Sequence, residues 1–269
     1  MISQEHTKAC PALSFQDVTF RYQSRFAKNP DVVLTALSYT IEAGSIVGIL
    51  GPNGSGKSTT IRLILGLLKK KTGTVALFGE LFSEQSRLKV LNKVGALIEN
   101  PSLYEHLNAI DNLKISANYR QNISTSRIDE VLEIVNLTKA KNKKIKEYSL
   151  GMKQRLGLAI SLLSNPELII LDEPTNGLDP KGIIEMRTLI KDLNKKFGTT
   201  IFISSHLLSE IEKTCTHVGI IRNGKMLYQD TVASLKENKG TNINLEIEVD
   251  KPLEALSVLQ NLKVKNISL

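Results

Sequence analysis

The sequence Gly51-Pro-Asn-Gly-Ser-Gly-Lys-Ser-Thr59 lies between an apolar run, residues 46–50, and an apolar helical pattern that starts at Ile61. Strand, glycine-rich loop and helix, in that order, are the context in which this motif marks a phosphate-binding loop. Its glycines lack a Cβ atom, so backbone N–H groups can turn inward at a helix N-terminus, where the helix dipole favours an anion. The sequence therefore predicts a nucleoside triphosphate site, in which Lys57 reaches the β- and γ-phosphates and Ser58 offers its hydroxyl to Mg²⁺. The loop residues assigned to the nucleotide are Gly51, Pro52, Asn53, Gly54, Ser55, Gly56, Lys57, Ser58 and Thr59.

The composition is that of an ordinary globular protein. The 269 residues can bury a substantial core, and 41% of them are hydrophobic and 23% charged. No apolar run approaches the ~20 residues of a membrane-spanning helix, and the N-terminus lacks a signal-peptide pattern, so we expect a cytoplasmic chain. The net charge of +8 suits nucleic acid, an anionic membrane or a phosphate ligand without selecting one. The lysine-rich stretches 69–71 and 139–146 lack interleaved aromatic residues and are read as solvated faces.

Hydrophobic periodicity predicts an α/β fold. Strands expected at 12–21 and 32–41 form an N-terminal antiparallel edge, and the alternation of helix and strand after the phosphate loop implies a mostly parallel sheet. Asn223-Gly224 predicts a hairpin turn between strands at 218–221 and 226–228. The other expected elements are strands at 46–50, 75–78, 94–98, 168–171 and 200–204, helices at 59–68 and 181–195, and a short helix near Arg87.

Residues 100–163 differ in character, because strand patterns vanish and helical patterns follow one another. Ser124 is a candidate N-cap, apolar residues from Ile128 to Val135 recur on one helix face, and 156–163 is a nearly all-apolar helix. We interpret this segment as a helical subdomain inserted into a main domain at residues 13–238, which follows a tail at residues 1–12. Residues 239–269 carry a β-α-β pattern too small to stand alone. This extension either leans on the main domain or begins a longer segment.

Two carboxylates follow the apolar run at 168–171. At the C-terminal end of a buried strand, Asp172 can bind Mg²⁺, directly or through water, and Glu173 can polarise a water that attacks the γ-phosphate. An isolated apolar run ending in Asp-Glu is more often a surface turn. The phosphate loop upstream reverses that interpretation.

Three further motifs point in one direction. Tyr148-Ser-Leu-Gly-Met-Lys-Gln-Arg155 is similar to the signature Leu-Ser-Gly-Gly-Gln, Asn176-Gly-Leu-Asp179 is similar to a D-loop, and His206 follows Ile-Ser-Ser as a switch histidine does. Their order and spacing over residues 13–230 resemble an ATP-binding cassette (ABC) ATPase. The resemblance implies a P-loop NTPase fold of ABC type, with ATP and Mg²⁺ as ligands. It adds to the nucleotide site Tyr22 (stacking on adenine), Ser149, Gly151, Asp179 and His206.

Each of these positions has a simpler interpretation. Ser149 can serve only as a helix N-cap, His206 as a satisfied polar residue, and Tyr22 as a core or edge tyrosine. The signature also departs from the family pattern, with Leu150 in place of Gly and Met152 in place of Gln. These changes affect backbone freedom and one polar contact without removing the expected anion site.

Glu99, in Ile-Glu-Asn-Pro-Ser-Leu-Tyr, stands where the family normally has Gln, at the hinge between sheet and helical subdomain. A carboxylate is a stronger ligand for a hard ion, so we expect Glu99 to take part in catalysis and to bind Mg²⁺. Near Asp172 and Glu173 it would also raise the pKa of its neighbours. Glu here, together with the Tyr148 motif, resembles the ATPases of lantibiotic immunity and bacitracin-resistance exporters; neutral drift at a tolerant position is the alternative.

The resemblance predicts an ATP-hydrolysing subunit of a transporter. Glu173, His206, Lys57 and Glu99 are the expected catalytic residues, and Ser58, Glu99 and Asp172 the expected metal ligands. The expected partners are integral membrane permease subunits and a second copy or a paralogue, arranged head to tail so that each ATP lies between one phosphate loop and the opposite Ser149 and Gly151. We expect a peripheral position on the inner face of the cell membrane and no nucleic acid. The alternatives are an ABC ATPase that acts on nucleic acid or the ribosome, and a regulatory ATP-binding module.

Overall fold

The computed structural model describes residues 10–22, 32–120 and 123–238. The chain divides into two compact units, residues 1–233 and 234–269. The elements described here belong to the first unit, except for most of the last helix, α8 (Val232–Asn238). The predicted extension at 239–269 lies outside the described residues, as do residues 1–9 of the predicted tail.

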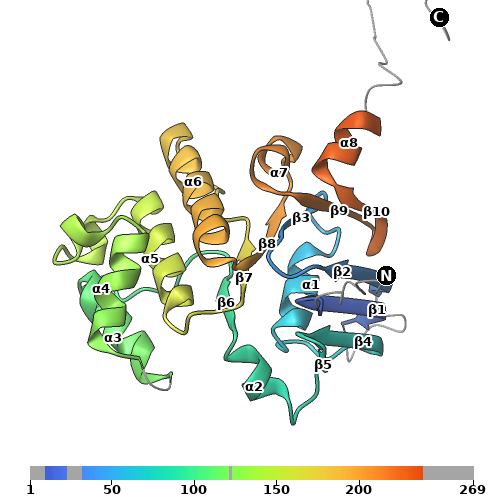
Figure 1. Ribbon diagram of the computed structural model, residues 1–269, viewed down its shortest axis with the longest axis horizontal. Coiled ribbons are helices and arrows are strands. Elements are labelled where there is room, and N and C mark those ends of the chain that lie inside the picture. The colour runs from blue at the N-terminus through green and yellow to red at the C-terminus, as the bar shows by residue number, and fades with distance from the viewer. Residues whose placement is uncertain (1–9, 23–31, 121–122, 239–269) are drawn as a thin grey trace, which may run out of the picture. The chain divides into compact units, whose positions relative to one another are not determined.

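The phosphate loop follows an inner strand of a six-stranded sheet with the order β10-β9-β3-β8-β7-β6 (Figure 1). All neighbours in this sheet are parallel except β10, which runs antiparallel to β9. Every residue of β7 and β8 is buried, as expected for parallel strands covered on both faces. The strands are β3 (Ile46–Leu50), β6 (Val94–Leu97), β7 (Leu168–Asp172), β8 (Thr200–Ser205), β9 (His217–Arg222) and β10 (Lys225–Thr231). The mostly parallel core is confirmed.

The predicted hairpin also forms. Asn223 and Gly224 connect β9 to β10 with φ angles of 49° and 72°. A two-residue turn of type I′ requires positive φ at both central residues, which the Asn-Gly pair tolerates.

The antiparallel strands form a sheet of their own, not an edge of the parallel sheet. Its order is β2-β1-β4-β5, with every neighbouring pair antiparallel. The strand predicted at 75–78 therefore pairs with β1 and not with the parallel core. Alternating apolar residues reveal a strand but not its partner. The strands are β1 (Leu13–Arg21), β2 (Val32–Ile41), β4 (Thr72–Leu77) and β5 (Glu80–Leu81).

An apolar core joins the two sheets to the helix after the phosphate loop, α1 (Lys57–Ile64). Tyr39 of β2 stacks on Phe15 of β1 with ring centroids 4.9 Å apart, and on Phe202 of β8 at 6.2 Å. Ile61 and Ile64 of α1 are fully buried in the same cluster. Each such aliphatic side chain stabilises the fold by roughly 1.5–3 kcal/mol, so the start of α1 is held against both sheets.

Helices replace strands between β6 and β7. They are α3 (Ala109–Asn118), α4 (Thr125–Ile134), η1 (Thr138–Ala140), η2 (Ile145–Glu147) and α5 (Leu150–Leu162). Asn108, Ser124 and Ser149 cap the three α-helices through their side-chain oxygens, which confirms Ser124 as an N-cap. In Figure 1, α3, α4 and α5 gather beside β6 and β7, away from β1, β2 and β4. Their apolar faces share a second core with α6.

Local signals set some boundaries and miss others. Helix α6 (Pro180–Phe197) begins after the N-cap Asp179 and ends at Gly198, whose φ is 65°. Helix α1 ends four residues earlier than predicted, just before Gly66 with a φ of 64°. The short helix predicted near Arg87 is α2 (Arg87–Leu91). The structure also contains β5, α7 (Leu208–Thr214) and α8, which were not predicted. Helix α7 buries only Ile211, too little to create a periodic pattern.

Candidate nucleotide site

Backbone hydrogen bonds and close packing hold the phosphate loop against the ends of neighbouring strands. The Gly51 N–H donates to the Ser205 carbonyl at 3.4 Å, and the Ser55 carbonyl accepts from the Gly224 N–H at 3.0 Å. A Cβ atom at position 51 would lie 2.4 Å from the Ile221 carbonyl oxygen, so only glycine fits there. The loop is thus anchored to β8 and to the β9–β10 hairpin.

The part of the loop next to the start of α1 fits an anion. Helix α1 begins after Gly56, whose φ of 111° few other residues adopt, and no side chain caps its first N–H groups. The Ser55 hydroxyl is buried and has no hydrogen-bond partner among the described residues. Uncapped helix N–H groups and an unpaired hydroxyl are what a phosphate group would satisfy. Pro52 and Asn53 lie exposed at the tip of the same loop.

Three residues far apart in the sequence meet at this loop. Lys57 is buried, and its ammonium group donates to the Gly51 carbonyl at 2.8 Å. One Glu173 carboxylate oxygen lies 3.5 Å from the Lys57 Nζ, and the other lies 3.0 Å from the Nδ1 of His206. The carboxylate therefore bridges the phosphate-loop lysine and the histidine, as expected of groups that surround one reacting phosphate.

Ser204 holds the two adjacent carboxylates in place. Its hydroxyl donates to the Asp172 carboxylate and accepts from the Glu173 N–H at 2.9 Å. Glu173 has a φ of 48°, a left-handed conformation that is costly for a residue with a side chain. This strained turn directs Glu173 away from β7 and toward Lys57. The motif Ile-Ser-Ser-His contains Ser204, but no local signal gave it a role.

Glu99 pairs with an arginine and not with these carboxylates. Its side chain is 67% exposed and pairs with Arg62 of α1 at 3.3 Å. Among the described residues, no hydrogen bond or ion pair joins it to Asp172 or Glu173. Its φ of 54° is also left-handed, as at Glu173. The metal-binding role predicted for Glu99 stays a prediction, and Arg62 is a partner that the sequence did not indicate.

The signature residues and the D-loop form a separate group. Ser149 caps α5 by accepting from the Met152 N–H at 3.3 Å, and Asp179 caps α6 by accepting from the Gly182 N–H at 3.1 Å. The Leu150 side chain borders Gly177, where a Cβ atom would lie 3.2 Å from its Cδ2. No hydrogen bond or ion pair joins Ser149 or Gly151 to the phosphate loop within the described part of the chain. The structure thus assigns Ser149 a capping role and leaves its nucleotide role a prediction.

Tyr22 directly follows β1. The side chain is 44% exposed and packs edge-on against Phe20, with ring centroids 4.8 Å apart. An accessible aromatic face is what stacking on a base requires, and the adenine contact of Tyr22 stays a prediction.

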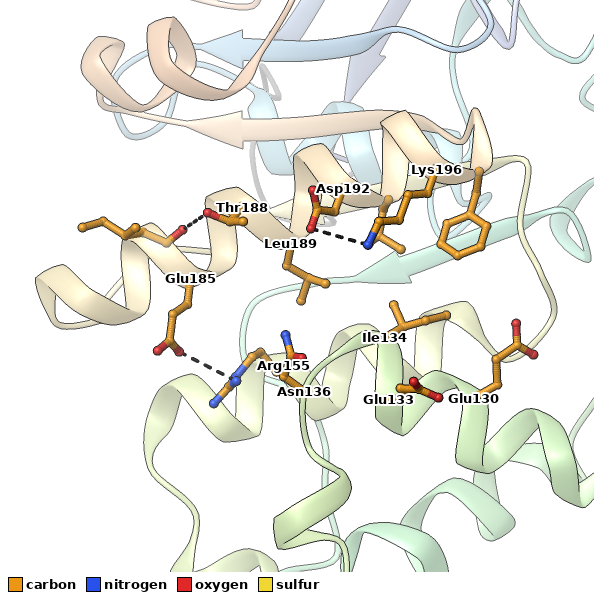
Figure 2. Close-up of a pocket in the computed structure, with 13 residues that line it drawn as sticks. Glu130, Glu133, Ile134, Asn136, Arg155, Glu185, Thr188, Leu189, Asp192 and Lys196 are labelled. Atoms are coloured by element: carbon orange, nitrogen blue, oxygen red, sulfur yellow. Dashed lines mark hydrogen bonds and ion pairs between the residues drawn. The ribbon is translucent and has the colours of Figure 1, made fainter.

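Two hollows differ in their relation to the predicted site. A cavity of about 690 Å³ lies between α4, α5 and α6, where Arg155 pairs with Glu185 at 3.7 Å (Figure 2). None of the predicted site residues lines it. A smaller cavity of about 150 Å³ borders Glu173 and His206 together with the D-loop. The larger of these two cavities thus lies away from the predicted site, whereas Lys57, Glu173 and His206 converge at the phosphate loop.

Comparison with known proteins agrees with this geometry. The family model described as "ABC transporter" matches residues 34–176. The bacitracin transport ATP-binding protein BcrA of Bacillus licheniformis is 48% identical over 211 residues, which cover 78% of this chain and 69% of that protein. The lantibiotic transport ATP-binding protein SrtF of Streptococcus pyogenes is 43% identical over 197 residues, which cover 73% and 83%.

A solved structure has the same fold. The dimeric ATP-binding cassette MJ0796 in a post-hydrolysis state, bound to ADP and Pi, superposes with a TM-score of 0.73 at 25% identity, over 82% of this chain and 98% of that one. The fold and site define an α/β P-loop ATPase of the cassette type.

The chain belongs to the ABC transporter family of ATP-binding proteins. It is an ATP-binding and ATP-hydrolysing subunit of a transporter, as the resemblance predicted. In the described ranges, no helix combines the length and the apolar character needed to cross a membrane.

Proposed function

We propose that this ATPase drives the export of an antimicrobial peptide of the bacitracin or lantibiotic type and so confers resistance or self-immunity. The observation that supports the cargo class is the identity of 48% and 43% to a bacitracin and a lantibiotic transport ATPase, each over more than two thirds of this chain.

The proposed hydrolysis depends on positioning and charge. Mg²⁺, when bound, neutralises the charge of the phosphates; Ser58 and Asp172 would hold it, and we include Glu99 as a further ligand. The Lys57 ammonium group stabilises negative charge on the γ-phosphate oxygens of ATP. The Glu173 carboxylate orients the attacking water and accepts its proton, while His206 contacts the γ-phosphate. The remaining loop residues and Tyr22 hold the nucleotide.

The proposed assembly supplies the rest of the site. A second copy, or a paralogous ATPase, faces each phosphate loop with its Ser149, Gly151 and Asp179, and the pair attaches to integral membrane permease subunits on the inner face of the cell membrane. ATP binding closes the pair and hydrolysis opens it, which transmits motion to those subunits. The MJ0796 dimer is a relative in which two cassettes pair.

A resistance assay tests the proposal. In the source strain, the chromosomal gene is replaced by the Glu173→Gln variant or by the control Glu84→Gln, which removes a carboxylate that is 83% exposed and pairs with Lys69. Growth is then measured in increasing bacitracin and in an increasing lantibiotic. We expect Glu173→Gln to lower the inhibitory concentration of one peptide class and Glu84→Gln to leave both unchanged. Unchanged resistance to both classes in Glu173→Gln would refute the cargo assignment.

A further inference from the structure

A single carboxylate ties together the two loops that carry Glu173 and His206. Glu210, in the first turn of α7, accepts from the Thr175 hydroxyl at 2.7 Å with one oxygen and from the Ser205 hydroxyl at 2.9 Å with the other. Both hydrogen bonds are partly buried, and hydrogen bonds to an ionised acceptor are about twice as strong as neutral ones. The predicted chemistry gave no role to Glu210.

The two hydroxyl groups belong to residues that lie close to Glu173 and His206 in the sequence. Thr175 comes two residues after Glu173, and Ser205 comes directly before His206. Strands β7 and β8 are parallel neighbours, with Asp172 opposite Ser204. Both segments therefore leave the sheet at the same edge, and Glu210 crosses the gap between them.

The Ser205 hydroxyl has one proton to donate, and Glu210 is the nearer of its two acceptors, since the Leu207 carbonyl oxygen lies at 3.4 Å. The hydroxyl accepts from the Leu207 N–H at 3.0 Å while it donates to Glu210. Ser205 is 2% exposed, so water cannot easily replace a lost partner. Removal of Glu210 would release both loops together, one on each side of the contact between Glu173 and His206.

We propose that Glu210 is a positioning residue for ATP hydrolysis, which fixes the distance between the Glu173 carboxylate and His206. This inference rests on the roles of Glu173 and His206 given under the proposed function, and it does not depend on the transported cargo. Because a misplacement of about 1 Å at a reacting group can lower a rate on the order of 100-fold, the contact has a measurable kinetic consequence.

The test is steady-state and single-turnover ATP hydrolysis by the full chain with Mg²⁺. For Glu210→Ala we expect kcat to fall roughly 10- to 100-fold, with KM for ATP close to wild type and a lower melting temperature, because two partly buried hydroxyls lose their acceptor. The less disruptive change Thr175→Val, which removes one of the two hydrogen bonds, should lower kcat by less. Glu84→Gln is the matched control and should hydrolyse ATP as wild type does.

Double variants separate positioning from a general structural role. If Glu210 acts through Glu173, then Glu210→Ala in the Glu173→Gln background should cause no further loss, and Glu210→Ala with Thr175→Val should lose no more than Glu210→Ala alone. Wild-type kcat in Glu210→Ala would overturn the inference. So would an additional full loss of kcat in the Glu173→Gln background, or a loss of ATP affinity as large as the loss of kcat. If the unmodified chain hydrolyses ATP and Glu173→Gln does not, unchanged peptide resistance of the Glu173→Gln strain would refute only the cargo assignment.

Discussion

Replacing Glu99 by Gln separates two roles that its carboxylate could have. The carboxylate pairs with Arg62 at 3.3 Å, and the two side chains are 67% and 40% exposed. An exposed ion pair stabilises a fold by about 0.2–1 kcal/mol. For a domain of this size, 1 kcal/mol changes the melting temperature by roughly 2–4 °C. Loss of the pair alone therefore lowers the melting temperature by about 4 °C at most.

If Glu99 binds Mg²⁺, its replacement should change the Mg²⁺ requirement of ATP hydrolysis and not only the melting temperature. A carboxylate is a harder ligand than an amide, and loss of a group that supports a metal site typically weakens metal binding about 10- to 100-fold. The Mg²⁺ concentration that gives half-maximal hydrolysis should then rise about tenfold or more in Glu99→Gln. Arg62→Gln breaks the same ion pair but keeps the carboxylate, so it should not raise the Mg²⁺ requirement.

The assay is phosphate release over a Mg²⁺ titration at several pH values, with melting curves for each variant. Superimposable titrations for Glu99→Gln and wild type would refute the metal role and favour neutral drift. An equal rise of the Mg²⁺ requirement in Glu99→Gln and Arg62→Gln would show that Glu99 acts through Arg62 and not on the metal.

Three further predictions follow from particular contacts. Glu173→Gln should bind ATP and accumulate as a dimer, which size-exclusion chromatography would detect. ATP hydrolysis by this variant at the wild-type rate would contradict the role of Glu173. Burial raises the pKa of the Cys215 thiol from 9.0 to about 12; the unfolded thiol ionises first, so stability falls as pH rises from 9 toward 12. Between pH 8 and pH 10, the free energy of urea unfolding should fall by about 1 kcal/mol less in Cys215→Ala than in wild type, and equal slopes would exclude this cause. Asp179→Ala removes the N-cap of α6 and should destabilise the fold by about 1 kcal/mol, with an unchanged urea midpoint as the contrary result.

Local sequence signals predicted the parallel core and the phosphate loop because each depends on residues that are close together in the chain. Strand β7 is a continuous apolar run, α6 has a cap at both ends, and the glycines of the loop stand in one motif. The partner of β1 depends on strands more than ten residues away, so the separate antiparallel sheet could not be derived from its alternating pattern.

The same distinction between local and long-range features applies to the candidate site. Sequence motifs identified Lys57, Glu173 and His206 singly, and the structure places the Glu173 carboxylate within 3.5 Å of both other side chains. Contacts made by ordinary residues left no signal: Arg62 looks like any surface arginine on a helix, and Glu210 like any acidic residue in a first turn. Their significance comes from what lies opposite them in space.

The Asn223-Gly224 hairpin limits how this protein can be altered. Hairpin tips are usually chosen for inserted labels or for new chain ends, because they tolerate change. Here the Gly224 carbonyl accepts from the Thr35 N–H at 2.9 Å while its N–H donates to Ser55. A Cβ atom at Gly224 would lie 2.1 Å from the Val33 carbonyl oxygen. A reporter inserted at this turn would therefore pull on the nucleotide loop itself, and a circular permutant opened there should lose ATP binding before it loses its fold.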